Sequence, residues 1–333
     1  MTAFSEQRYT RMRYRHCGRS GLSLPLISLG TWETFGGYRG AEVAKQCFFR
    51  AFDLGITHFD FANNYGTPAG NAEIVCGKII KEMPRDELLI STKAGFGMWP
   101  GPYGEWCSRK HLLASCDQSL KRMGVDYFDI FYSHCFDPNT PLEETLGALD
   151  QLVRQGKALY VGVSNYDGAS FTKAAQVCEA RNLAPITVHQ PYYNMLNRRV
   201  EWDLLPNAER TGAGVVAFSP LASGILTSKY LDGTIPKDSR AAVKWAEGGE
   251  EFVKRNLPEE RLAALKTLNE MARGRDQTLA QMALAWTFRL PGVTSVLTGA
   301  SKVEQIEENV GALNNMDFNA DELALIDRLF PAR

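Results

Sequence analysis

The sequence predicts a closed (β/α)8 TIM barrel, and three observations favour this fold. Apolar, β-rich runs alternate with segments of helical spacing, there are eight such runs, and no Pro/Ser-rich linker divides the 333 residues. Continuous apolar strands that alternate with helices are typical of a parallel sheet whose outer face is covered. Barrels of this kind usually take about 250 residues plus insertions. We therefore expect a single domain over residues 1–333, with a doubly wound open sheet as the alternative.

The apolar runs and the segments between them define the expected elements. After the first strand, apolar residues from Val43 to Leu54 recur every three or four positions, and Gly55 can end that helix. Residues 146–153 and 279–286 have the same helical spacing. The expected strands are residues 26–30, 57–62, 88–94, 128–134, 159–165, 186–190, 215–221 and 295–299.

Three further segments lie outside this repeat. Residues 10–25 predict a short N-terminal β-hairpin, with its turn at residues 19–21. Residues 222–257, after the seventh strand, form the most polar and irregular stretch, and a loop of that length is usually functional or mobile. Residues 320–330 predict an extra helix packed against the barrel.

Composition narrows the range of functions and of cellular compartments. The formal net charge is -1, so no global field attracts the protein to nucleic acid or to a membrane surface. No apolar run is long enough to span a bilayer, and the first residues lack the apolar core of a secretory signal. The seven cysteines include no Cys-x-x-Cys, which predicts reduced thiols and no zinc site. We therefore expect a cytoplasmic protein without a metal site that binds neither nucleic acid nor membrane.

Polar and aromatic side chains recur at the ends of the expected strands. In a (β/α)8 barrel the functional site lies at the C-terminal ends of the strands. Taken alone, each residue is explained as a buried polar group whose hydrogen bonds are made within the protein. The whole set together favours a functional site. These residues are Asp60, Tyr65, Lys93, His134, Ser164, Asn165, Gln190, Phe218 and Ser219.

Four of these residues predict proton transfer to a carbonyl oxygen. Asp60 lies in an apolar strand and needs a compensating charge, and Lys93 ends the next strand. We expect the Lys93 ammonium to lower the pKa of the Tyr65 phenol, whose ordinary value is near 10. His134 can orient the carbonyl oxygen or donate to it. Such a site contains a general acid but no nucleophile, so it predicts hydride from a nicotinamide cofactor.

The chain resembles the aldo-keto reductase superfamily over nearly its whole length. The resemblance implies that Tyr65 is the general acid, that Lys93 and Asp60 tune it, and that His134 orients the substrate carbonyl. These roles agree with the interpretation from the residues alone. The matching motifs are Phe59-Asp-Phe-Ala-Asn-Asn-Tyr-Gly66, Ser91-Thr-Lys93, Tyr127-Phe-Asp-Ile-Phe-Tyr-Ser-His134, Gly162-Val-Ser-Asn165, His189-Gln190 with Tyr193-Asn194, and Gly299-Ala-Ser301.

A cofactor site is expected near the last strands. The nearest approach to Gly-x-Gly-x-x-Gly, residues 95–101, runs into prolines and is interpreted as a loop. Barrels often bind phosphate at their last strands. Ser301 is expected to open a helix, with Glu304 completing a capping box. A nearby anion would offset the cost of Lys302 in that first turn, although a solvated surface lysine explains this residue equally well.

The resemblance implies NADPH as the cofactor. The ends of the fifth and sixth strands match the site of the nicotinamide amide, and Phe218 stands where many relatives stack Tyr or Trp on the nicotinamide. Lys229 and Arg240 resemble clamps of the pyrophosphate and the 2′-phosphate, and cations there favour NADPH over NADH. The positions expected to contact the cofactor are Thr31, Trp32, Asp60, Ser164, Asn165, Gln190, Phe218, Ser219, Leu221, Gly224, Lys229, Arg240, Gly299, Ser301, Lys302, Gln305, Glu308 and Asn309.

An apolar substrate wall is expected from the aromatic loop 96–106 and from Trp32. Packing of the loop alone also explains each of its aromatic residues. The expected substrate contacts are Trp32, Tyr65, Met98, Trp99 and His134.

These loops resemble the bacterial glyceraldehyde 3-phosphate reductase subgroup, which is itself similar to the β subunits of voltage-gated potassium channels. The resemblance implies reduction of L-glyceraldehyde 3-phosphate and of small aldehydes such as methylglyoxal. It leaves open a channel-associated regulatory subunit that senses redox state, although the lack of a long inactivation-type N-terminal extension favours the enzyme. Relatives range from monomers to tetramers and larger assemblies, so a homo-oligomer stays open. An aldolase is disfavoured because Asp60 would keep Lys93 charged and non-nucleophilic.

Overall fold

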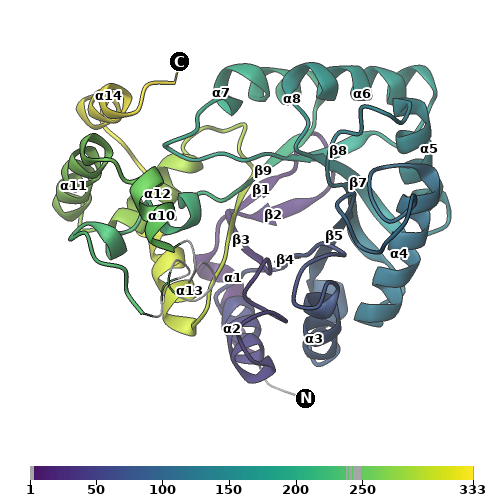
Figure 1. Ribbon diagram of the computed structural model, residues 1–333, viewed down its shortest axis with the longest axis horizontal. Helices are drawn as coiled ribbons and strands as arrows, with labels where there is room; N and C mark the ends of the chain where they lie inside the picture. The colour runs from purple at the N-terminus through teal and green to yellow at the C-terminus, as the bar shows by residue number, and fades with distance from the viewer. Residues whose placement is uncertain (1–3, 238, 240–241, 243–248, 333) are drawn as a thin grey trace.

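Eight parallel strands form a closed barrel with helices around it (Figure 1). The computed structural model describes residues 4–237, 239, 242 and 249–332. The order around the barrel is β10-β3-β4-β5-β6-β7-β8-β9, so the last strand closes on the first. The (β/α)8 prediction is confirmed, and the alternative of an open sheet is wrong. The barrel strands are β3 Ile27–Gly30, β4 His58–Asp60, β5 Leu89–Ala94, β6 Phe128–Ser133, β7 Ala158–Ser164, β8 Ile186–Gln190, β9 Gly214–Phe218 and β10 Ser295–Thr298.

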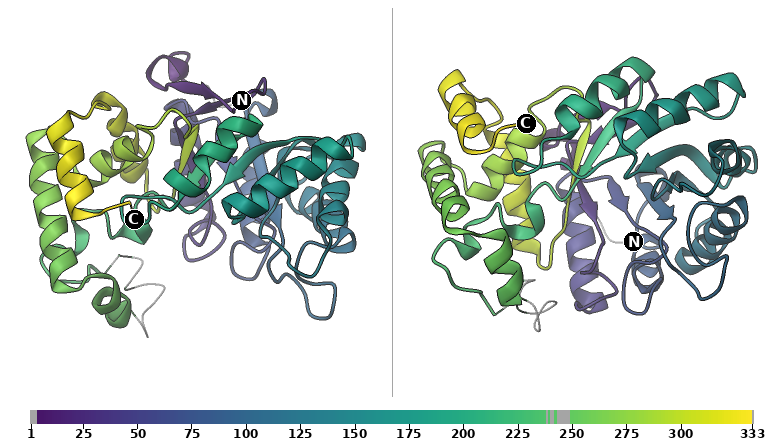
Figure 2. Two further views of the ribbon diagram at one scale, coloured as in Figure 1. Left: turned by 90° about the horizontal axis from the view of Figure 1, so that it is seen from above. Right: turned by 45° about the horizontal axis from the view of Figure 1, so that its top comes forward.

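The outer layer consists of helices that follow the strands. Two helices near the C-terminus, α11 and α14, pack on each other at one end of the molecule, seen as green and yellow ribbons in Figure 2. Among the described helices, none is both long and apolar enough to cross a bilayer. The helices are α1 Arg8–Arg11, α2 Ala41–Asp53, α3 Asn71–Ile80, α4 Arg109–Met123, α5 Leu142–Arg154, α6 Gly168–Ala180, α7 Val200–Asp203, α8 Leu205–Thr211, α10 Gly249–Asn256, α11 Glu259–Gly274, α12 Leu279–Thr287, α13 Val303–Val310 and α14 Ala320–Leu329.

Local signals explain where the helices begin and end. Helix α2 ends at Asp53, and Gly55 follows with a φ of 86° that few other residues adopt. Helix α4 begins after Ser108, whose side chain accepts a hydrogen bond from the His111 N–H at 3.3 Å. Helix α12 begins with a complete capping box between Thr278 and Gln281.

Several strands end earlier than predicted. Strand β4 covers three residues of the expected 57–62, and β9 stops at Phe218 instead of residue 221. After β9, Ser219 adopts a left-handed φ of 53° and Pro220 has no N–H to donate. After β7, Asn165 turns the chain with a φ of 58°. These turns place polar side chains just beyond the strands, at the mouth of the barrel.

The N-terminal hairpin closes the opposite mouth of the barrel. Strand β1 (Tyr14–His16) pairs antiparallel with β2 (Ser23–Pro25), as predicted. Cys17 and Leu24 are fully buried in one apolar cluster with the barrel-interior residues Ile130 and Tyr132. The Arg19 N–H donates to the Gly212 carbonyl at 2.9 Å and fixes the turn against the barrel. A site in the barrel therefore opens at the C-terminal ends of the strands.

Candidate active site

A buried ion pair lies at the end of strands β4 and β5. Lys93 is fully buried, and its Nζ donates to Asp60 Oδ2 and to the Phe61 carbonyl, the latter at 2.6 Å. Asp60 Oδ1 accepts from Ser91 Oγ at 2.6 Å and from Gln190 Nε2 at 3.1 Å. Burial lowers the pKa of Lys93, and the charge of Asp60 opposes this change. Hydrogen bonds to both carboxylate oxygens offset the cost of burying the charge.

A chain of hydrogen bonds leads from the barrel interior to Asp60. His58 Nδ1 lies 2.9 Å from Ser28 Oγ, Nε2 lies 2.9 Å from Ser91 Oγ, and Ser28 Oγ lies 2.7 Å from Ser295 Oγ. Because the Ser91 hydroxyl proton is donated to Asp60, Ser91 Oγ accepts from His58 Nε2–H. Burial lowers the pKa of His58 to about 4, so the ring is neutral at pH 7 and Nδ1 accepts from Ser28. Every donor in this chain therefore points towards Asp60.

Tyr65 lies on the loop that follows β4. Its ring centroid lies 5.2 Å from Lys93 Nζ and 6.0 Å from the ring of His134. Burial raises the pKa of the Tyr65 phenol, and the charge of Asp60 raises it further. Our expectation of a lowered pKa is wrong, because burial and the charge of Asp60 outweigh the stabilisation of the phenolate by Lys93, whose ammonium is hydrogen-bonded to Asp60 and to Phe61. The phenol therefore keeps its proton at neutral pH.

His134 follows β6 directly and is held through its backbone. Its N–H donates to the Ala94 carbonyl at 2.9 Å, and its carbonyl accepts from Asn165 Nδ2 at 3.0 Å. Burial lowers the pKa of the imidazole well below its ordinary value, and the Lys93 charge acts in the same direction. Among the described residues, His134 Nδ1 is buried without a hydrogen-bond partner, and the Phe96 ring lies 4.6 Å away. A neutral imidazole is therefore fixed beside the phenol.

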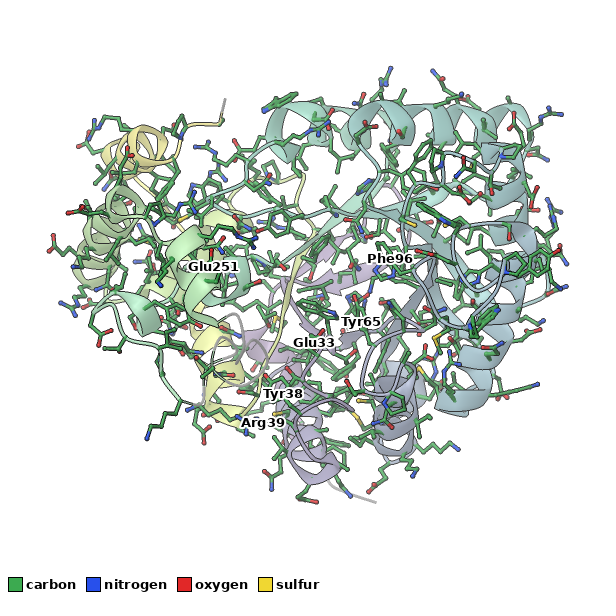
Figure 3. All side chains as sticks on the ribbon, viewed as in Figure 1. Glu33, Tyr38, Arg39, Tyr65, Phe96 and Glu251 are labelled. Carbon is green, nitrogen blue, oxygen red and sulfur yellow. The ribbon has the colours of Figure 1, made fainter. Side chains whose placement is uncertain are left out.

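These side chains meet at one cavity of about 640 Å³. Asp60, Tyr65 and His134 line it, whereas Lys93 lies behind Asp60, outside the described lining. Figure 3 shows Tyr65 and Phe96 over the middle of the barrel and Tyr38 further out, near the start of α2. This volume lies in the range of small-molecule sites. Within the described ranges, no group of three or more His, Cys, Asp or Glu side chains is placed to hold a metal ion.

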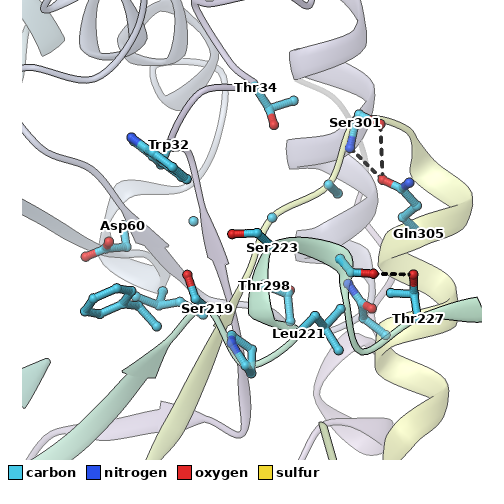
Figure 4. A pocket seen from close by; sticks show the side chains of 18 of the residues that line it. Trp32, Thr34, Asp60, Ser219, Leu221, Ser223, Thr227, Thr298, Ser301 and Gln305 are labelled. Carbon is cyan, nitrogen blue, oxygen red and sulfur yellow. Dashed lines mark hydrogen bonds between the residues drawn. The ribbon is translucent and has the colours of Figure 1, made fainter. Parts of the chain in front are cut away.

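Most residues expected to contact a cofactor also line this cavity, and Figure 4 shows part of that wall. Thr31 is buried behind the wall, where its Oγ1 donates to the Asp60 carbonyl at 2.9 Å. Lys302 is exposed and outside the described lining, and Arg240 lies outside the described residues. The expected cofactor contacts that lie in the lining are Trp32, Asp60, Ser164, Asn165, Gln190, Phe218, Ser219, Leu221, Gly224, Lys229, Gly299, Ser301, Gln305, Glu308 and Asn309.

The start of α13 differs from the predicted capping box. The helix begins at Val303, and its N-cap is Lys302, which makes no side-chain capping hydrogen bond. Ser301 instead donates from its N–H at 2.8 Å and from its Oγ at 3.2 Å to Gln305 Oε1 (Figure 4). The prediction of a capping box between Ser301 and Glu304 is therefore wrong, because the chain is still extended at Lys302, with a φ of -162°.

The residue through which loop 96–106 lines the cavity differs from the two residues that we predicted. Trp32 is 42% exposed and lines the cavity as expected. Met98 and Trp99 are absent from the described lining, and the Trp99 ring packs on His111 at 4.7 Å. Phe96 lines the cavity instead. Its place two residues beyond β5 is the sequence signal that could have identified it.

Sequence reasoning missed further residues of the cavity wall. Most lie within a few residues of a strand end that had already been identified, so distance from that end was the available signal. Tyr38 and Tyr230 lie further out, and only the folded loops bring them to the cavity. The missed lining residues include Gly30, Thr34, Tyr38, Asn64, Phe96, Tyr192, Ser223, Thr227 and Tyr230.

Comparison with known proteins identifies the family. The model of the Aldo/keto reductase family matches residues 26–330. The chain belongs to the aldo-keto reductase family. This aldo-keto reductase is 53% identical over 328 residues to the L-glyceraldehyde 3-phosphate reductase of Escherichia coli K12. The matched region covers 97% of this chain and 93% of that protein. It is also 39% identical over 306 residues to an Arabidopsis thaliana protein named "Probable voltage-gated potassium channel subunit beta", covering 91% and 92%. The protein is therefore an oxidoreductase.

Proposed function

We propose that this aldo-keto reductase reduces small aldehydes to alcohols with NADPH, and that Tyr65 donates the proton. The observation that carries the proposal is the meeting of Tyr65 and His134 at one cavity, directly beside the buried pair of Asp60 and Lys93. The 53% identity to an L-glyceraldehyde 3-phosphate reductase supports that aldehyde as a substrate. We extend the proposal to small aldehydes such as methylglyoxal.

The wall of the cavity fits an extended dinucleotide. Near the catalytic side chains it carries the hydroxyl of Ser164 and the carboxamide of Asn165, together with the ring of Phe218. At the far end, Ser301 lies just before α13 and Asn309 lies in the last turn of that helix. When bound, a nicotinamide cofactor supplies hydride to the carbonyl carbon. Polar groups at both ends, with the aromatic ring of Phe218 beside those at the catalytic end, support this class of ligand.

The chemistry expected of the protein is proton transfer under electrostatic control. His134 is neutral and can donate one hydrogen bond to the carbonyl oxygen, which orients the aldehyde. Tyr65 keeps its proton until negative charge develops on that oxygen, because an alkoxide is more basic than a phenolate. Lys93, with its Nζ 5.2 Å from the ring centroid, then stabilises the phenolate that forms. Trp32 and Phe96 in the wall reduce the access of water.

Two other functions lead to different expectations. An aldolase needs a lysine that reaches its substrate, and Lys93 is fully buried behind Asp60. A regulatory subunit that senses redox state is the second candidate, and the 39% identity to a plant protein named as a channel subunit favours it. That role predicts tight NADPH binding with little turnover of any soluble aldehyde.

The test follows NADPH absorbance with a panel of short aldehydes that includes L-glyceraldehyde 3-phosphate and methylglyoxal. We expect turnover by the native protein, and we expect Tyr65→Phe to lose about 10²- to 10⁴-fold in kcat, the usual contribution of a general acid. NADPH affinity should be unchanged, because the phenol is needed for proton transfer. Tyr103→Phe, an exposed tyrosine of loop 96–106 outside the described lining, is the matched control. Near-normal turnover by Tyr65→Phe would exclude the proposed acid.

A further inference from the structure

Two cysteines face each other beside the candidate active site. The Sγ atoms of Cys107 and Cys135 lie 4.0 Å apart, and both side chains are buried. Cys135 follows His134 directly, and Cys107 ends the loop that begins at Gly95 and carries Phe96. The two thiols therefore lie between the two segments that form the His134 side of the cavity.

The backbone holds both thiols in place. The Cys107 N–H donates to Asp137 Oδ2 at 3.0 Å, and the Cys107 carbonyl accepts from Thr145 Oγ1 at 2.9 Å. The Cys107 thiol lies 3.2 Å from the Cys135 carbonyl, and Ser133 Oγ lies 3.1 Å from the same carbonyl. These contacts therefore hold the two thiols side by side in the reduced protein.

The environment of Cys107 differs from that of the other cysteines. A hydrogen bond from the Cys135 thiol lowers the pKa of Cys107, against the effect of burial, whereas the same hydrogen bond and burial raise the pKa of Cys135. Burial raises the pKa of Cys47 to about 11 and that of Cys178 to about 11. A thiolate is the reactive form of cysteine, so Cys107 is better prepared for oxidation than these two thiols.

We propose that Cys107 and Cys135 form an oxidation site for a small peroxide, and that the product is an intramolecular disulfide. One thiol attacks a peroxide oxygen, which gives a sulfenic acid and releases water when the oxidant is hydrogen peroxide. The second thiol then displaces the sulfenic hydroxyl as a second water, so that two thiols are oxidised and one peroxide is reduced. Cys107 is fully enclosed and Cys135 is 7% exposed, which favours a small oxidant over glutathione disulfide.

The disulfide would change the geometry next to the reacting groups. A disulfide needs a sulfur–sulfur distance of about 2.05 Å, so the two sulfur atoms must approach by roughly 2 Å. Both sulfur atoms lie 3.1 Å and the Cβ of His134 lies 3.2 Å from the place where a Cβ on Gly95 would stand, so the pair lies directly beside the segment that carries His134. On the proposed function, a shift of His134 by about 1 Å would lower kcat/KM by up to about 100-fold.

The experiment treats the native protein with hydrogen peroxide and measures disulfide formation separately from activity. We expect the intact mass to fall by two hydrogens, a peptide map to link residue 107 to residue 135, and aldehyde reduction to fall and to return with a thiol reductant. Failure of the untreated protein to reduce aldehydes would count against the proposed function alone. Absence of the linked peptide would overturn the oxidation site whatever the activity.

Variants and a second oxidant separate this pair from general oxidation. Cys135→Ser and Cys107→Ser should each give no linked peptide, and each should keep its own starting activity after peroxide. Cys178→Ser, which changes a buried thiol of α6, should stay as sensitive as the native protein. Peroxide inactivation of Cys135→Ser equal to that of the native protein would contradict the proposal, and so would a glutathione adduct on Cys107 or Cys135 in the folded protein.

Discussion

The two ends of the cavity are built in different ways. At the proposed catalytic end, Asp60 and Lys93 lie on adjacent strands, are buried and pair with each other, and Asp60 also accepts hydrogen bonds from Ser91 and Gln190. At the α13 end, Ser301 is held by Gln305, and Lys302 is exposed. Strand register fixes the first set, whereas local loop conformation fixes the second. Substitutions at the proposed catalytic end should therefore have larger effects than substitutions at the α13 end.

The largest effect is expected when the buried ion pair is broken. Lys93→Met should abolish turnover and lower the free energy of unfolding by about 3–5 kcal/mol, because Asp60 is left as a buried charge without its cation. Lys45→Met is the matched control, since Lys45 pairs with Glu82 at 2.7 Å on the surface. That variant should lose at most about 1 kcal/mol. Urea denaturation measures both values, and equal losses would show that burial at the catalytic end does not matter.

The buried histidines predict a dependence of stability on pH. Burial lowers the pKa of His58 to about 4 and that of His189 to about 3, below the unfolded value near 6.5. Between pH 6.5 and 4 the unfolded chain therefore binds more protons than the folded one, and stability is full above 6.5 and falls as the pH drops towards 4. The loss should be on the order of 3 kcal/mol for His58.

Equilibrium unfolding at several pH values between 7 and 5 measures this slope. His189→Asn should flatten it, because one buried neutral imidazole is removed. His16→Gln, which changes an exposed histidine of β1, should leave the slope as it is in the native protein. A slope that is the same in all three proteins would contradict the role of burial.

A smaller effect is expected along the hydrogen-bond chain to Asp60. Ser91→Ala removes a donor to the carboxylate, worth about 1.5–3 kcal/mol for a charged group, so kcat should fall by at least about tenfold. Ser295→Ala makes the same substitution at the far end of the chain and should lower kcat by less, because it removes no hydrogen bond to Asp60. Equal losses of kcat in the two variants would contradict the importance of the direct hydrogen bond from Ser91 to Asp60.

The smallest effect is expected at the α13 end. Lys302 is exposed, so Lys302→Ala should weaken NADPH by no more than about 1 kcal/mol, or roughly fivefold, and NADH by less. Lys266→Ala, an exposed lysine of α11, should change neither affinity. Fluorescence titration of both cofactors measures the difference. Equal weakening of NADPH and NADH would show that Lys302 does not read the 2′-phosphate.

The strand order and the pairing of Asp60 with Lys93 could be predicted from the sequence. Apolar runs with helices between them already specify a parallel barrel, and an acid inside an apolar strand requires a cation nearby. The positions of strand ends were less accurate, because Asn165 and Ser219 turn the chain through left-handed conformations that sequence pattern does not reveal. The start of α13 was missed for a similar reason, since Gln305 rather than Glu304 contacts Ser301.

The sequence by itself determined the barrel and the kinds of groups at its C-terminal mouth, because both depend on local periodicity and on residue type. Only the tertiary structure decided that Phe96 lines the cavity while Trp99 packs on His111. It also decided that the pKa of Tyr65 is raised, and that Cys107 faces Cys135. These properties depend on burial and on contacts between distant segments, which exist only after the chain has folded.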